Sequence, residues 1–326
     1  MGFKKWLVGD MELAALAAAG LFVIALAVAL QGGFPASGQP VSPALAAAPQ
    51  EPMKAPEFAG LSNWFNSKPL TLAGLKGKVV LLNFWAYSRI NCLRALPYLK
   101  QWDEKYGDKG LVVIGVHSPE FGFEQQPENV QAAIRQLGIR YPVALDNGHA
   151  TWNAYENQLW PHQYLIDKEG IIRYHHAGEG AYDETEKAIQ LLLGEETPLS
   201  EPKDAQAVDF SRVLTPEIYL GTSKFMPGTE KFVGLKGKWK QNPDSIELEE
   251  AIGIVRVAFQ AKSVNIVAEA PEGATLTILL DGKPVGKFQV KEPRLYPLAV
   301  AGDYGRHGAE FGISGKGFKL YTVTFG

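Results

Sequence analysis

The sequence has very little cysteine: Cys92 is the only one among 326 residues. A single cysteine excludes an internal disulfide and a four-cysteine metal site. The six histidines show no ligand spacing, and the adjacent His175 and His176 would point to opposite faces of a strand. We therefore expect neither a metal nor another cofactor.

An excess of charge of one sign is also missing. The chain carries 32 basic and 35 acidic residues, which gives a net charge of −3, and we find no run rich in lysine or arginine. Nucleic-acid-binding proteins normally carry a basic patch or stripe. The composition therefore argues against nucleic acid as a partner.

One long apolar run is present, Leu13–Leu30. As a helix it would be about 27 Å long, enough to cross most of a bilayer core. Two lysines precede it and no charge follows until Glu51, so the positive-inside rule places residues 1–12 in the cytoplasm. A cleaved signal peptide is the alternative, but its apolar core is normally shorter and its cleavage site nearer. We expect a single-pass anchor at 13–30 in the lipid of the inner (cytoplasmic) membrane, with everything after it periplasmic.

The next segment, 31–55, contains five prolines and many alanines. This composition predicts an extended linker. Residues 56–194 then show short apolar runs that alternate with amphipathic stretches, which predicts an α/β domain with helices on both faces of a central sheet. The elements we expect are strands at 78–84, 111–116, 141–145, 164–166 and 171–175, and helices at 92–106, 127–137 and up to 193.

Residues 83–92 read Asn-Phe-Trp-Ala-Tyr-Ser-Arg-Ile-Asn-Cys. A strand, an aromatic turn and a helix that begins near a cysteine form the layout of a thioredoxin active site. More narrowly, 85–92 resembles the Trp-Thr-Tyr-Ser-Cys-Ile-Asn-Cys site of the thioredoxin-like periplasmic domain in DipZ-type membrane proteins. The likeness extends over about 58–326. Further segments that resemble that family, in the same order, are 113–121, 141–146, 150–155, 160–167, 174–180 and 321–326.

Two positions decide what this resemblance implies for chemistry. Arg89 stands where the family has its first cysteine, and Cys92 is the second. Without the first thiol the chain cannot cycle between dithiol and disulfide by itself, so we expect no catalytic residue and a degenerate site. For Cys92 we expect an inert, buried thiol, with a monothiol role as the alternative. For Arg89 the alternatives are a solvated surface arginine and a docking contact with an acid on this chain or on a partner.

The resemblance also implies a binding ledge beside this turn. Pro161, after Trp160, occupies the cis-proline position of thioredoxin-like folds, which faces the active-site turn. Tyr87, His117 and Glu120 belong to the same end of the predicted sheet and are candidate docking residues. A general acid/base pair of His117 and Glu120 is a further alternative, although it would have no nucleophile to serve.

After a polar second linker at 195–209 the periodicity changes to two. Alternating apolar residues and the hairpin signal Asp281-Gly282 predict an all-β domain at 210–326, a β-sandwich of jelly-roll type. Aromatic residues of this domain could face a glycan, as in carbohydrate-binding modules, or could be core residues. They are Tyr219, Trp239, Tyr296 and Tyr304.

The function that these patterns favour is a redox-inactive, membrane-anchored scaffold subunit on the periplasmic face of a larger inner-membrane complex. Protein partners in that complex are expected. Residues 5–10 resemble the start of light-harvesting antenna polypeptides, which favours a photosynthetic complex, and a respiratory complex fits almost as well. The alternatives are a monothiol oxidoreductase that uses Cys92 and an envelope glycan-binding protein.

Overall fold

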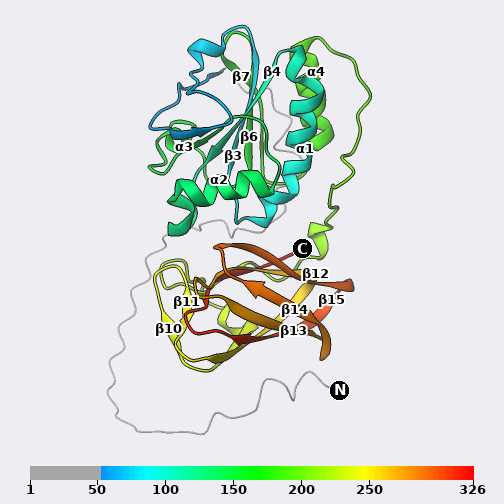
Figure 1. Cartoon of the computed structure of the whole chain (residues 1–326). Helices are drawn as coiled ribbons and strands as arrows, with labels where there is room; N and C mark the ends of the chain where they lie inside the picture. Colours follow the sequence, from blue (N-terminus) through cyan, green and yellow to red (C-terminus); the bar gives the residue numbers. More distant parts are fainter. Residues whose placement is uncertain (1–52) are drawn as a thin grey trace, which may run out of the picture. The chain divides into compact units, whose positions relative to one another are not determined.

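The computed structural model describes residues 53–326 (Figure 1). The expected anchor at 13–30, the residues before it and most of the predicted linker lie outside the described residues. Within 53–326 we find no helix that is both long and apolar enough to cross a membrane.

The N-terminal domain is built on a seven-stranded sheet in the order β1-β7-β6-β3-β4-β5-β2. The central strands β3, β4 and β5 are parallel, β6 pairs antiparallel with β3, and β7 pairs antiparallel with β6. The predicted α/β domain is confirmed. Its elements are β1 (Met53–Lys54), β2 (Ser62–Phe65), β3 (Val79–Trp85), α1 (Ile90–Tyr106), β4 (Leu111–His117), α2 (Pro127–Gln136), β5 (Val143–Leu145), α3 (Ala150–Ala154), β6 (His162–Ile166), β7 (Ile171–Ala177) and α4 (Tyr182–Leu193).

Strand β3 shows why the sheet is covered on both faces. All seven of its residues are buried, and successive side chains point to opposite faces. Leu81 packs in the core under α1, α2 and α4, whereas Leu82 packs in the core under α3. A continuous apolar strand is therefore what this central position requires.

Both linkers differ from their predicted form where the structure describes them. Strand β1 pairs with β7 and Ala55 is buried, so 53–55 belong to the first domain and not to the linker. The second linker, 195–209, is tied to α1 by hydrogen bonds to the side chains of Gln101, Lys105 and Tyr106. Strand pairing positions 53–55, and side-chain contacts position 195–209. Neither kind of contact produces a local sequence pattern, so the sequence did not indicate them.

The C-terminal domain is all-β, and its nine strands form one hydrogen-bonded sheet. Seven of them follow the order β10-β11-β16-β12-β15-β13-β14, while β8 pairs with β16 and β9 pairs with β12. The paired strands β12 and β15 are unusually long, and their register shifts near Ala261. Before the shift β12 also pairs with β9, and after it with β16. The strands are β8 (Ile218–Tyr219), β9 (Val233–Lys236), β10 (Trp239–Gln241), β11 (Ile246–Leu248), β12 (Ile252–Glu269), β13 (Ala274–Leu280), β14 (Lys283–Val290), β15 (Arg294–Ser314) and β16 (Lys319–Phe325).

The predicted hairpin turn at Asp281-Gly282 is confirmed. It joins β13 to β14, and both residues have positive φ angles, 51° and 75°. A two-residue turn of this kind matches the twist of the flanking strands, and Asp-Gly is a favoured pair for it. The local sequence alone therefore determines this connection.

Candidate functional site

The position of the missing nucleophile lies between β3 and α1. Arg89 is the residue directly before the helix and has extended φ and ψ angles of −90° and 121°. A cation at a helix N-terminus opposes the helix dipole, at a cost of about 0.3–1 kcal/mol. Nearby negative charge is therefore needed to hold the guanidinium there.

Two carboxylates supply that charge, one from each domain. Arg89 Nη1 lies 2.5 Å from Glu120 Oε1, and Nη2 lies 3.2 Å from Glu217 Oε2. The Tyr219 hydroxyl lies 3.0 Å from Arg89 Nη1. Only 14% of the Arg89 side chain is exposed. The alternative of a solvated surface arginine is therefore wrong: the acid that this residue meets is on its own chain.

Glu120 is the centre of the network. Its carboxylate also accepts hydrogen bonds from the Tyr219 hydroxyl at 2.7 Å and from Lys224 Nζ at 3.1 Å. Burial works to raise the pKa of this carboxyl, but Arg89 and Lys224 outweigh it and hold the pKa below its ordinary value. For Glu217, burial outweighs Arg89 and raises the pKa. The arrangement thus contains two cations and two acids that bridge the domains.

An apolar cluster lies beside these charges. Phe121 of the first domain is buried with Val267, Leu295 and Tyr321 of the second. The Phe121 and Tyr321 rings are 5.2 Å apart. The contact between the domains therefore has a buried apolar part and an ionic part, and it covers the end of the sheet where thioredoxin chemistry would occur.

Cys92 lies in the first turn of α1 and faces the core. It is 1% exposed, and burial raises the pKa of its thiol to about 12. At neutral pH almost no reactive thiolate is present, since the thiolate is the nucleophilic form. The geometry agrees with the expected inert, buried thiol.

A direct prediction follows for this thiol. Alkylation of Cys92 by iodoacetamide at pH 8 should be at least about 1,000-fold slower in the folded chain than in the urea-unfolded chain, because both the raised pKa and burial suppress attack. The rate is measured by mass spectrometry of the single modified residue. Equal rates in the two states would contradict it.

The two candidate docking residues Tyr87 and His117 are buried together. Their rings stack 5.6 Å apart, and the Tyr87 hydroxyl donates to the Pro293 carbonyl of the second domain at 3.2 Å. Burial lowers the pKa of His117 to about 3, so the ring is neutral. Tyr87, His117, Glu120 and Arg89 therefore contact their own chain and present no open surface to a partner. Nor do His117 and Glu120 form an acid/base pair, because Glu120 is bound to Arg89 and Lys224.

Comparison with known proteins decides the family. Residues 50–192 match the Redoxin family, and 223–326 match the family described as thioredoxin like C-terminal domain. The chain is 30% identical to the thiol-disulfide oxidoreductase YkuV of Bacillus subtilis over 146 residues, which are 45% of this chain and 97% of that protein. This chain belongs to the thioredoxin-like redoxin family.

A second relative matches both domains. Protein DipZ of Mycobacterium tuberculosis is 36% identical over 299 residues, which cover 83% of this chain. The chain spans only 43% of the length of that protein. A third, the thiol-disulfide oxidoreductase ResA of Bacillus thuringiensis, is 31% identical over 38% of this chain and 69% of its own length.

The cis-proline that the resemblance implied for the binding ledge is present in the redoxin domain. The Trp160–Pro161 bond is cis. Trp160 Nε1 donates to the Ser118 carbonyl at 3.0 Å, and the Arg89 guanidinium lies 5.2 Å from the centre of the Trp160 ring. The ledge is therefore next to position 89, and the arginine lies against it.

Sequence reasoning missed several residues of the site. Glu217 and Lys224 lie more than 100 residues from Arg89, and no local pattern marks them. Glu124 is fully buried and accepts hydrogen bonds from the Ser88 hydroxyl at 2.8 Å and from the amide of Glu120 at 2.7 Å. Burial, and then Glu120, raise the pKa of this carboxyl. Nothing in the local sequence, where Glu120, Gln125 and Gln126 are also polar, marks it as buried.

The four candidate glycan-facing aromatics do not form one surface. Tyr219 belongs to the ionic network, Trp239 packs against the core of the C-terminal domain, and Tyr296 is buried. The Tyr304 ring contacts Arg212 and Lys262. Among the described residues no ring contact joins any two of the four. The expectation of a shared stacking platform is therefore corrected.

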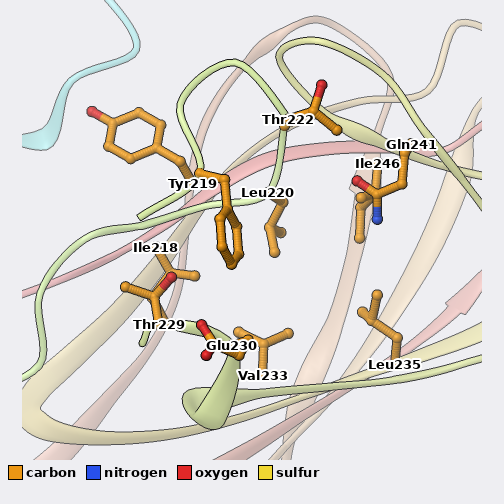
Figure 2. A pocket seen from close by; sticks show the side chains of 12 residues that line it. Ile218, Tyr219, Leu220, Thr222, Thr229, Glu230, Val233, Leu235, Gln241 and Ile246 are labelled. Carbon is orange, nitrogen blue, oxygen red and sulfur yellow. The ribbon is translucent and has the colours of Figure 1, made fainter. Parts of the chain in front are cut away.

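A cavity of about 400 Å³ lies in the C-terminal domain beside Tyr219 (Figure 2). Its walls are mostly apolar and come from β8, β9, β11 and the loop between β8 and β9; they include Ile218, Leu220, Phe225, Leu235 and Ile246. The Tyr219 hydroxyl points away from the other lining side chains in this view. The ring of Tyr219 thus lines the cavity while its hydroxyl belongs to the ionic network.

Proposed function

We propose that this protein is a redox-inactive redoxin-family protein with a structural role, a scaffold subunit of a larger membrane complex. One observation carries the proposal: a guanidinium, bound by two carboxylates, occupies the position where thiol chemistry needs a nucleophile. The remaining thiol is buried, and its pKa is raised to about 12. A fold with this site can bind but cannot exchange two electrons by itself.

Reduction of insulin disulfides in the presence of dithiothreitol tests the redox part. We expect the purified chain to give a rate equal to that of dithiothreitol alone, because its one thiol is buried and its raised pKa leaves almost no thiolate to attack the substrate disulfide. A thioredoxin of known activity is the positive control. Turnover above the background, lost on Cys92→Ala, would overturn the proposal and support the monothiol alternative.

The scaffold role and the membrane location form the second part of the proposal. The apolar run 13–30 would anchor the chain in the inner membrane and leave the redoxin and β domains periplasmic. The partner would be a protein of a photosynthetic or respiratory complex. Mild detergent extraction followed by native mass spectrometry tests this. Recovery of the protein as a lone chain would count against a scaffold.

The envelope glycan-binding alternative has less support. Its candidate aromatics lie in separate environments, and the exposed wall of the cavity beside Tyr219 is mostly apolar. Sugar sites normally combine a flat aromatic face with several hydrogen-bonding groups, so these walls are a poor match. The glycan hypothesis is therefore not the one we advance.

A further inference from the structure

We propose that Arg89 is an interdomain lock: it fixes strand β8 of the C-terminal domain over the redox face of the redoxin domain, so that this face is occupied in cis. The inference rests on the proposed function only in taking Arg89 as a non-catalytic residue. It adds a role for the arginine, names the segment that it holds, and implies that any partner protein binds elsewhere on the molecule.

The contacts of Arg89 run from the redoxin domain to the C-terminal domain. Arg89 comes from the redoxin domain, while two of its three hydrogen-bonding partners, Glu217 and Tyr219, lie on or next to β8. The two residues are two apart in an extended segment, so their side chains lie on the same face. That face is directed at the position where a substrate disulfide would have to approach.

The carboxylates of Glu120 and Glu217 need a cation between them. A carboxylate oxygen of Glu120 and one of Glu217 each lie within hydrogen-bonding distance of the Tyr219 hydroxyl, at 2.7 and 3.1 Å, so the two carboxylates lie close together in a mostly buried place. Without a cation between them they would repel each other at short range. Arg89 is the group that contacts both of them. A guanidinium suits this position because its planar, forked donors can serve two acceptors at once.

The contacts between segment 217–224 and Glu120 depend on one another. Tyr219 donates to Glu120, and Lys224 donates to the Glu120 carboxylate and to its main-chain carbonyl, at 3.1 and 3.0 Å. The Lys224 ammonium also lies 4.8 Å from the centre of the Phe121 ring. One short segment, 217–224, therefore makes the polar contacts that hold the loop after β4. Removing one of these hydrogen-bond donors should weaken the remaining hydrogen bonds, because all of them hold the same segment against the single acceptor residue Glu120.

Amide hydrogen exchange on the full chain tests the lock. The amides of Glu120 and Phe121 donate to the buried carboxylate of Glu124, under the covered face. In R89M these two amides should exchange at least about 10-fold faster than in the native protein, because the loop after β4 loses the charged hydrogen bonds through which Arg89 holds it to the C-terminal domain. E217Q, which keeps the shape of the side chain, should accelerate them in the same direction.

A double-mutant cycle separates a lock from a general loss of stability. In the R89M background the E217Q substitution should give no further acceleration, because its partner is already gone and the repulsion between Glu217 and Glu120 is removed. The matched controls are R135M, at an exposed arginine of α2, and E249Q, at an exposed acid of the C-terminal domain, and neither should change the two amides. Independent, multiplicative effects of R89M and E217Q would overturn the lock.

The readouts also distinguish the two proposals. If the exchange rates are unchanged in R89M while the native chain shows no insulin reduction, the lock is wrong and the redox-inactive function stands. If the native chain turns over, the function is wrong whatever the exchange rates show. Should R89M fail to fold, Y219F, which removes one hydroxyl and keeps the ring, supplies the same comparison.

Discussion

The R89C variant is expected to reduce insulin disulfides slowly, and the R89C/E217A/Y219A variant at least about 10-fold faster, a change of about 1.4 kcal/mol in the barrier. R89C restores two thiols three residues apart at the start of α1. The thiolate at position 89 attacks one sulfur of the substrate disulfide and releases a substrate thiolate. Cys92 then attacks the mixed disulfide and releases the second substrate thiol. Dithiothreitol reduces the resulting protein disulfide and supplies the two electrons.

The difference between the two variants follows from what remains after the arginine is gone. In R89C the Tyr219 and Lys224 hydrogen bonds to Glu120 and the apolar cluster around Phe121 still hold the two domains together. The new thiol therefore stays covered. Removing the Glu217 carboxylate and the Tyr219 ring opens the approach to it.

Two controls accompany this series. R89C/C92A lacks the resolving thiol, so only dithiothreitol can release its mixed disulfide, and it should turn over more slowly than R89C. R89C/E249A removes an acid at the surface of the C-terminal domain and should reduce insulin at the same rate as R89C. Equal rates for R89C and for the triple variant would contradict the idea that β8 restricts access to position 89.

Local sequence signals were enough to predict most of the fold. The buried strand β3 was marked by its continuous apolar residues, the helix α2 by Pro127 at its first position, and the β13–β14 hairpin by Asp281-Gly282. Each of these is a short-range preference of the backbone or of burial. The position of the degenerate site was predictable for the same reason, because the turn from 85 to 92 is contiguous.

The partners of Arg89 were not predictable in this way. Arg89 and Glu217 are 128 residues apart, and their contact exists only because two domains meet. An exposed-looking arginine in a turn has the same local sequence whether it is solvated or buried against a second domain. The strand β1 and the attached second linker were missed for a similar reason: both are positioned by tertiary pairing and not by their own propensity.

A second buried ion pair connects α1 to the loop between β7 and α4. Arg94 Nη1 lies 3.3 Å from Glu179 Oε1, and both side chains are less than a tenth exposed. A side chain on Gly326, the last residue of the C-terminal domain, would collide with the Arg94 guanidinium, so the end of the chain packs closely against it. Burial raises the pKa of Glu179 to about 7, although Arg94 opposes the rise.

The sign of the resulting pH dependence follows from proton binding. The folded-state pKa of Glu179 is about 7, above the ordinary value of 4.5. Between these two values the folded state holds a proton that the unfolded state has lost. The contribution of Glu179 to stability is therefore largest below pH 4.5 and decreases as the pH rises through 7, where the folded carboxyl ionises.

R94M should lower the free energy of unfolding by about 3–5 kcal/mol at pH 8, because it leaves a buried carboxylate without its cation. At pH 5 the loss should be clearly smaller, because Glu179 can keep its proton and needs no counter-charge. Urea denaturation at the two pH values measures the difference, and R135M, at an exposed arginine on α2, should show almost no loss at either. An equal loss at pH 5 and pH 8 would mean that Arg94 acts through packing against Gly326, and not through the Glu179 carboxylate.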